Sequence, residues 1–316
     1  MSFSTKLKTW VELQELPKHT TTLLPFVLGV VLAWYATGLF NWGIFITALF
    51  AVFFITNGTF ISNEYFDYET DKINIGRVGG EKQAVTSTGG TRVLAKGLIK
   101  REHALIASVI CFLLAMPLGI VLQLYFKTGS WTIPLGALGI LVGWFYTAPP
   151  VKAVYRGWGE LFMTIGYGTL LFVGYYILAG LSWLPVIVAL PWAVCVPALK
   201  ILREFPDYEA DAAVGKRNLV VQFGREKMAL VYIFMISAVL LLLIPVFLAV
   251  KSWWLVLIAV PVFLLLRSLI PMVKGLWRDK KTLDFICVNG FLGMLSLPLA
   301  MLAIFVIVGI VSQKVG

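Results

Sequence analysis

Long apolar stretches recur along the whole chain and alternate with polar segments. A helix that crosses a bilayer needs about 20 mostly apolar residues. Nine stretches meet this requirement, with expected bounds of 23–40, 43–62, 103–125, 131–149, 160–181, 183–200, 228–249, 253–270 and 285–312. The pattern therefore predicts an all-α, polytopic membrane bundle of nine transmembrane helices.

The composition agrees with a membrane bundle and excludes the main soluble classes. The 316-residue chain is 59% apolar and 13% charged, whereas a soluble protein is about 45–50% apolar and about 25% charged. The three cysteines fall inside apolar stretches, so a disulfide framework is not expected. Disordered and collagen-like chains are excluded as well. Because the first 22 residues are polar and no cleavage pattern follows the first apolar stretch, a cleaved signal peptide is not expected.

The net charge of +10 is concentrated on one side of the predicted bundle. Of the 26 lysines and arginines, 23 lie in the amino-terminal stretch or in the segments 63–102, 150–159, 200–227 and 267–284. Nine crossings leave only Lys127, Lys251 and Lys314 on the other side. Because cytoplasmic loops are enriched in cations, the amino terminus is expected in the cytoplasm and the carboxyl terminus outside. Membrane lipid accounts for this basic charge, so no nucleic acid partner is expected.

Two aspartate-rich motifs follow apolar stretches at the predicted cytoplasmic border. The first contains Asn63, Asp67 and Asp71, after the second stretch. The second contains Arg203, Asp207 and Asp211, after the sixth stretch. A spacing of four residues stacks side chains along one face of an α-helix. Each motif is therefore predicted to present a row of polar side chains.

The stacked aspartates of each motif suggest a metal site. Like charges one helical turn apart repel each other, so they call for a compensating cation. Mg²⁺ prefers a small number of oxygen ligands and usually bridges carboxylates to substrate phosphates. Alternatively, the acids are solvated or pair with the nearby cations Lys72, Arg77, Lys216 and Arg217. The same spacing found twice favours Mg²⁺, although Pro206 is expected to start a fresh turn in the second motif.

A basic loop that contains glycine follows each motif. The first loop runs over 72–97 and carries Arg77 and Arg92, and the second places Lys216 beside Gly215. Glycine lets backbone amides approach an anion, and lysine or arginine supplies positive charge. Beside metal-type carboxylates, these loops indicate a bound diphosphate. The recurrence predicts a single domain over 1–316 with two pseudo-repeated parts, at about 23–150 and 160–312.

A third polar stretch runs from Tyr146 to Glu160 and joins the fourth and fifth apolar stretches on the same side. It carries Lys152, Tyr155 and Arg156 close together. A proline-stiffened turn with an aromatic belt at the membrane interface would explain its prolines and its tryptophan. Such a turn explains the gathered polar residues less well, so a ligand-binding role is also considered.

These three stretches together resemble the UbiA superfamily of intramembrane aromatic prenyltransferases. The family's first motif, Asn-x-x-x-Asp-x-x-x-Asp, is matched at Asn63, Asp67 and Asp71. The second motif is matched at its two aspartates, but Arg203 stands where the family often has asparagine. The stretch from Tyr146, together with Pro17-Lys18, is similar to the branch that prenylates 1,4-dihydroxy-2-naphthoate in menaquinone synthesis. Leu16 replaces the arginine that is usual in that branch.

The resemblance implies Mg²⁺-dependent transfer of a polyprenyl group from a polyprenyl diphosphate to an aromatic acceptor. It implies that four catalytic aspartates hold Mg²⁺ together with Asn63, namely Asp67, Asp71, Asp207 and Asp211. The residues expected to bind the diphosphate or the acceptor are Asn63, Arg77, Arg92, Tyr146, Lys152, Arg156, Arg203 and Lys216.

The implied chemistry passes through an allylic carbocation, which water would quench, so a dry cavity is expected. Tyr65, Phe66 and Tyr146 are candidate rings for stabilising that cation, with ordinary core packing as the alternative. His19 and His103 flank apolar stretches, and we expect interfacial placement for both rather than a role as general base.

Other functions stay open at this point. The same chemistry could act on 4-hydroxybenzoate, homogentisate, a chlorin or a glyceryl phosphate. A secondary transporter would also have pseudo-repeats and proline-broken helices, but its ionisable residues usually lie near the bilayer midplane. Here the apolar stretches contain almost no charge, and the acids lie at their ends, which favours an enzyme. A non-catalytic anchoring protein leaves the repeated acidic spacing unexplained.

Overall fold

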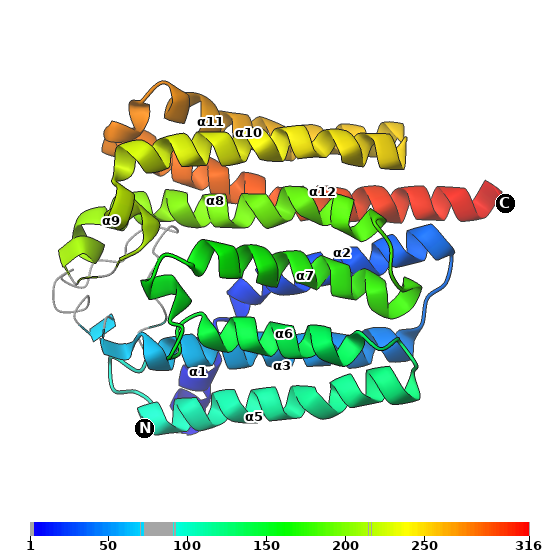
Figure 1. Cartoon of the computed structure of the whole chain (residues 1–316), viewed down its shortest axis with the longest axis horizontal. Coiled ribbons are helices and arrows are strands. Elements are labelled where there is room, and N and C mark those ends of the chain that lie inside the picture. Colours follow the sequence, from blue (N-terminus) through cyan, green and yellow to red (C-terminus); the bar gives the residue numbers. More distant parts are fainter. Residues whose placement is uncertain are drawn as a thin grey trace.

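The structure is a computed structural model that describes residues 3–69, 71–72, 91, 93–213, 215 and 217–315. Every regular element in these ranges is helical (Figure 1). The α-helices are α1 (Phe3–Leu13), α2 (Thr20–Thr37), α3 (Trp42–Phe66), α5 (Arg101–Ile120), α6 (Thr132–Phe145), α7 (Gly159–Ala179), α8 (Leu184–Ala213), α9 (Leu219–Phe223), α10 (Arg225–Val250), α11 (Ala259–Val273) and α12 (Lys280–Val315). Short helical turns connect them at η1 (Leu16–His19), η2 (Val121–Tyr125), η3 (Ala153–Tyr155), η4 (Trp253–Ile258) and η5 (Leu276–Arg278).

The membrane bundle predicted from the sequence is confirmed. Eight helical segments within the described residues are long and apolar enough to cross a membrane. The remaining predicted crossing corresponds to α6, which is apolar but has only 14 residues. α6 is shorter than the predicted 131–149 because the chain leaves the helix at Tyr146 and enters the turns that lead to η3.

α8 corrects the sequence prediction at Pro206, where a fresh turn was expected. The helix instead continues through Pro206 to Ala213. A proline at this position deprives the Leu202 carbonyl of its usual N–H donor. The thiol of Cys287, on α12, lies 3.9 Å from that carbonyl oxygen and donates to it. A neighbouring helix therefore compensates for the missing hydrogen bond, as is common in membrane bundles.

The closest helix packing joins α2 to α7. A Cβ atom added to Gly29 on α2 would lie 2.0 Å from the backbone oxygen of Leu171. One added to Gly174 on α7 would lie 2.2 Å from the backbone oxygen of Phe26. Because only glycine allows two helical backbones to approach this closely, these two positions fix the α2–α7 contact. α12 packs on both α2 and α8 and joins the later helices to this pair.

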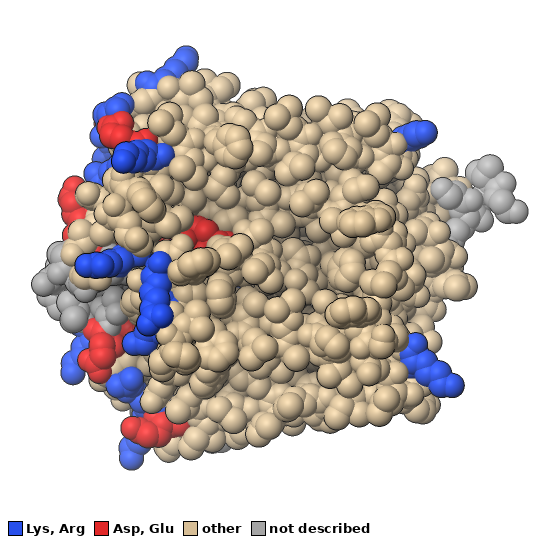
Figure 2. Space-filling model, in the orientation of Figure 1, with Lys and Arg blue, Asp and Glu red and all other residues tan. Residues whose placement is uncertain are grey.

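Charged side chains gather at one end of the bundle (Figure 2). The carboxyl-terminal ends of α3 and α8, which lead into the two aspartate motifs, lie at this end (Figure 1). The carboxyl-terminal part of α12 lies at the opposite end, as an odd number of crossings requires. The long sides between the two ends are apolar and expose large side chains such as Leu113 and Phe234, which suits contact with lipid. The fold therefore brings both aspartate motifs to one border of the bundle.

Candidate active site

The first aspartate motif continues the helical path of α3. The Asp67 N–H donates to the Asn63 carbonyl at 2.8 Å, and the Asp71 N–H donates to the Asp67 carbonyl at 2.9 Å. These bonds have the spacing of an α-helix, so the three side chains share one face, as the sequence predicts. Asp71 is buried, whereas Asn63 and Asp67 are half-buried.

The second motif lies on the last turns of α8. Because α8 is unbroken, Asp207 and Asp211 lie one helical turn apart on the same face. The buried Asp211 carboxylate accepts a hydrogen bond of 2.7 Å from the Asn218 side-chain amide. Asn218 also caps α9, since its side-chain oxygen accepts from the Val221 N–H at 2.8 Å. The chain after α8 therefore folds back and holds the end of the motif.

The third polar stretch closes over the first motif. The Thr147 hydroxyl donates to the side-chain oxygen of Asn63 at 2.8 Å. The Tyr155 hydroxyl donates to the Asp67 carboxylate. The stretch is held in shape by its own backbone, because the Val154 N–H donates to the Tyr146 carbonyl at 2.9 Å. Two side chains of the first motif are thus oriented by residues that lie more than 80 positions later in the sequence.

The same stretch reaches α8 through a buried ion cluster. The Lys200 ammonium contacts the carboxylate of Glu160, the second residue of α7, and lies 2.5 Å from the carboxylate of Glu204. The side chains of Glu160, Lys200 and Glu204 are only 11%, 13% and 7% exposed. From the sequence, Lys200 is expected to be one of the loop cations of the 200–227 segment, and Glu204 is expected to have no role in the site. The available signal was their spacing of four residues, which favours a Lys–Glu pair on one helix face.

Tyr146 follows the last residue of α6 and begins the third polar stretch. Part of its ring is accessible, but its hydroxyl is enclosed and donates to the Met163 sulfur at 3.7 Å. Burial raises the pKa of this hydroxyl, and the charges of Glu160, Glu204 and Asp67 raise it further, whereas Lys200 opposes them. Tyr146 therefore stays protonated at neutral pH. Both Asp67 of the first motif and Glu204 on α8 therefore influence this hydroxyl.

The remaining predicted site residues fall into three groups. Lys152 and Arg156 are exposed at the charged end of the bundle. Arg203 is half-buried on α8, one turn before Asp207. The other predicted cations, Arg77, Arg92 and Lys216, lie outside the described residues.

Two rings considered from the sequence have other neighbours. The Arg101 guanidinium lies 4.8 Å from the centroid of the Tyr65 ring, so one face of this ring already contacts a cation. Phe66 packs edge-on against Trp144 at 5.3 Å. Of the three candidate rings, Tyr146 has the position that best suits the site.

His19 is the residue before α2, and its ring is enclosed by protein. Its ring is buried against Phe53 and Phe60, with centroids 5.2 and 5.3 Å away. Nε2 lies 3.1 Å from the Gln14 carbonyl oxygen and donates to it. Burial lowers the pKa of His19 below its ordinary value of 6.5. A neutral imidazole is therefore part of the packing between η1 and α3.

The donor set of the two motifs suits a hard divalent cation, because it consists of carboxylate and amide oxygens. Within the described ranges, no group of three or more histidine, cysteine, aspartate or glutamate side chains is arranged to hold a metal ion. An ion at this end would therefore take further ligands from water or from a bound phosphate. Mg²⁺ is usually held in this way, by one or two carboxylates and the substrate.

Comparison with known proteins identifies the family. Residues 22–295 match the family model described as the UbiA prenyltransferase family. The chain belongs to the UbiA prenyltransferase family. The matched range leaves out α1, η1 and the last part of α12, and it includes both aspartate motifs. This UbiA-family chain is accordingly an integral, multi-pass membrane protein and a prenyltransferase.

Relatives and solved structures agree with this family assignment. The 1,4-dihydroxy-2-naphthoate octaprenyltransferase of Bacillus subtilis is 24% identical over 278 residues, which cover 84% of this chain and 81% of that protein. A digeranylgeranylglyceryl phosphate synthase structure has a TM-score of 0.70 at 22% identity, over 95% of this chain and 98% of that one. A UbiA homolog from Archaeoglobus fulgidus, bound to DMAPP and Mg²⁺, has a TM-score of 0.64 at 15% identity, over 93% and 99% of the two chains. At these identities the structural likeness establishes the UbiA fold.

Proposed function

We propose that this UbiA-family chain transfers a polyprenyl group from a polyprenyl diphosphate to 1,4-dihydroxy-2-naphthoate. The observation that carries the proposal is the third polar stretch, which contacts Asp67 through Tyr155 and contacts α8 through Glu160. One short segment thereby links the two aspartate motifs at the charged end of the bundle. The similarity to the Bacillus subtilis octaprenyltransferase supports naphthoate as the acceptor.

In this proposal Asp67, Asp71, Asp207 and Asp211, with Asn63, hold Mg²⁺ against the diphosphate. When bound, Mg²⁺ supplies positive charge that stabilises the departing diphosphate. Two of the ligands are already oriented, because Thr147 fixes the Asn63 amide and Tyr155 fixes the Asp67 carboxylate. Such outer hydrogen bonds orient metal ligands and sharpen their affinity.

Cations near the motifs are proposed to bind the anionic parts of both substrates. Arg203 faces the diphosphate from the helix that carries Asp207. Lys152 and Arg156 are exposed next to the third stretch and are available to the carboxylate of the naphthoate. Arg77, Arg92 and Lys216 complete the proposed set, which follows the general preference of phosphates and carboxylates for lysine and arginine.

The apolar interior is proposed to hold the polyprenyl tail and to exclude water from the carbocation. Tyr146 stays neutral, so its ring presents an electron-rich face without an ionised hydroxyl that the cation would alkylate. The proposed membrane orientation, with the amino terminus and the site in the cytoplasm and the carboxyl terminus outside, is supported by the charge distribution.

The proposal is tested with purified protein, octaprenyl diphosphate and a panel of acceptors, in Mg²⁺ and in excess EDTA. We expect prenylated naphthoate only with Mg²⁺, and its loss in Asp67→Asn and in Asp207→Asn. Lys127→Gln, in the connection between η2 and α6 at the opposite end of the bundle (Figure 1), is the matched control and should keep full activity. Undiminished turnover in EDTA, or full activity in either aspartate variant, would remove the metal assignment.

The acceptor panel also tests a second candidate, a glyceryl phosphate. This candidate is favoured by the similarity in fold to digeranylgeranylglyceryl phosphate synthase. Transfer to glyceryl phosphate but not to naphthoate would replace the proposed acceptor and leave the chemistry intact. Transfer to neither, with transport of substrate across vesicles, would favour a transporter instead.

A further inference from the structure

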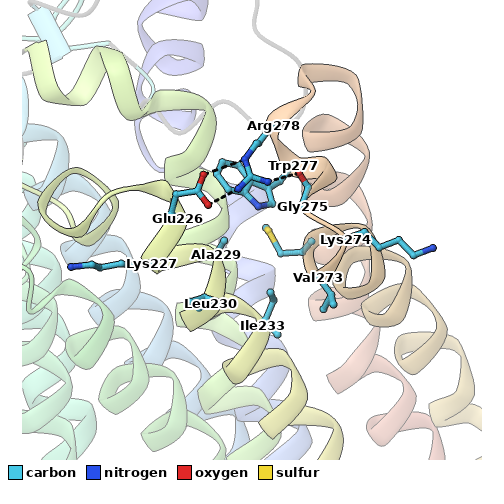
Figure 3. Close-up of a pocket in the computed structure, with 11 residues that line it drawn as sticks. Glu226, Lys227, Ala229, Leu230, Ile233, Val273, Lys274, Gly275, Trp277 and Arg278 are labelled. Carbon is cyan, nitrogen blue, oxygen red and sulfur yellow. Dashed lines mark hydrogen bonds and ion pairs between the residues drawn. The ribbon is translucent and has the colours of Figure 1, made fainter.

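A groove separate from the candidate active site opens between α10 and α11. It lies where the amino-terminal turns of α10 face the carboxyl-terminal end of α11 and η5 (Figure 3). Its volume is about 420 Å³. None of the candidate site residues lines it. The groove is therefore a second feature at the charged end, with no part in the chemistry proposed above.

Arg278 forms the polar end of the groove and makes three hydrogen bonds there. Its Nε and Nη2 donate to the two carboxylate oxygens of Glu226 at 3.2 and 2.6 Å, and its Nη1 donates to the Gly275 carbonyl at 3.1 Å. The guanidinium also lies 4.6 Å from the centroid of the Trp277 ring. A guanidinium has five N–H donors, so two of them remain for another acceptor. The fixed fork suits a phosphate oxygen.

The walls of the groove below Arg278 are apolar. Ile233 on α10 lies opposite Val273 on α11 (Figure 3), and Leu230 also lines the groove. Leu230 is 67% exposed and Val273 is 60% exposed. Both lie on helices that cross the membrane, so they are accessible to lipid. The groove is thus amphipathic along its length, with charge at the border of the bilayer and apolar walls toward its interior. A phospholipid has the same arrangement, with a charged headgroup at the bilayer border and apolar acyl chains toward the interior.

The charge around the groove favours an anion. Lys227 and Lys274 flank it on opposite sides, with their ammonium groups directed outward (Figure 3). Glu226 is the only carboxylate among the residues that line this groove, and Arg278 neutralises it. The next acid along the chain, Asp279, accepts from the N–H and hydroxyl of Thr282 at 2.9 and 2.8 Å. Two lysines thus remain in excess, and cations at a membrane surface attract anionic lipid.

We propose that this groove binds an anionic phospholipid of the phosphatidylglycerol class. The lipid phosphate accepts hydrogen bonds from Arg278, and one acyl chain lies between α10 and α11. Lys227 and Lys274 raise the local concentration of anionic lipid without contacting the phosphate directly. A prenyl diphosphate fits less well, because the groove offers no carboxylate pair for the Mg²⁺ that accompanies a diphosphate.

Native mass spectrometry of the full-length protein, released from detergent, tests this proposal. The protein is incubated with equal amounts of phosphatidylglycerol and phosphatidylcholine, and the lipid that it retains is measured. We expect phosphatidylglycerol to be retained in preference to phosphatidylcholine. The variant Arg278→Gln removes the proposed phosphate donor and lowers the net charge of the groove by one, so it should retain at least about fivefold less phosphatidylglycerol, since one cation near a membrane surface contributes about that factor.

Two further variants separate lipid binding from a folding defect. Val273→Trp fills the apolar part of the groove without changing any charge and should also lower retention. Lys251→Gln removes a cation at the opposite end of α10 and should leave retention unchanged. Equal retention of both lipids, or wild-type retention in both groove variants, would overturn the proposal. Displacement of phosphatidylglycerol by geranylgeranyl diphosphate, or by free glycerol phosphate, would also overturn it, because the groove would then belong to a substrate or to a soluble phosphate.

Discussion

Replacing Tyr155 with phenylalanine isolates the contact between the third polar stretch and the first aspartate motif. The substitution keeps the ring and removes only the hydroxyl that donates to Asp67. A hydrogen bond to a charged group contributes about 1.5–3 kcal/mol. Loss of an outer partner of a metal ligand typically costs about 10–100-fold in metal affinity. We therefore expect the half-saturating Mg²⁺ concentration to rise about 10–100-fold.

The assay is prenyl transfer by purified protein over a range of Mg²⁺ concentrations. Because the variant loses orientation of a ligand and not the ligand itself, its rate should recover at saturating Mg²⁺. Tyr176→Phe is the matched control, since the Tyr176 hydroxyl accepts from the Trp131 N–H at 3.1 Å near the other end of α7. An unchanged Mg²⁺ requirement in Tyr155→Phe would refute the reasoning. A loss of rate that Mg²⁺ does not restore would assign Tyr155 a purely structural role.

Three further predictions concern stability, each measured by thermal unfolding in detergent. Lys200→Met should cost about 3–5 kcal/mol by leaving two buried carboxylates without their cation, or roughly 6–10 °C. The triple variant that also carries Glu160→Gln and Glu204→Gln should recover most of this loss, and equal melting temperatures for the two would contradict the ion cluster. Gly29→Ala should destabilise the α2–α7 contact by at least about 1–3 kcal/mol because its Cβ meets the Leu171 carbonyl oxygen. Gly119→Ala, with open space around its Cβ, should be neutral or stabilising, so a stable Gly29→Ala would contradict the close backbone approach. The folded-state pKa of His19 lies below its ordinary value of 6.5, so its contribution to stability is complete above pH 6.5 and is lost as the pH falls below it. The melting temperature should therefore fall less between pH 7.5 and pH 5.5 in His19→Gln than in the wild type, and an equal fall would show that His19 does not titrate in this range.

The helices were predictable because the thickness of the bilayer fixes how long an apolar stretch has to be. The register of the first motif was also predictable, because residues four positions apart lie on the same face of an α-helix. The existence of α8 followed from its apolar residues, but its continuation past Pro206 did not. The hydrogen bond that compensates for Pro206 comes from Cys287, which lies 81 positions away in the sequence and reaches α8 only in the folded bundle.

The hydrogen-bond and ion-pair partners of the polar side chains could not be predicted from the sequence. In the sequence Lys200 looks like one of the cations of the segment 200–227. Only the fold places it between Glu160 and Glu204. His19 has polar neighbours in sequence, whereas its neighbours in space are the rings of Phe53 and Phe60. Tyr155 was part of the quoted motif, but its hydrogen bond to Asp67 depends on the turn at η3. The two pseudo-repeated parts stay a prediction.

The glycine contact between α2 and α7 limits how a lipid-borne molecule gets in. Most neighbouring helices are separated by side chains, and rotation of those side chains can briefly widen the space between them. At Gly29 and Gly174 the two main chains touch directly, with no rotatable group between them. A long isoprenoid that enters from the bilayer therefore has to pass between other helices. The α2–α7 contact stays closed while those helices separate.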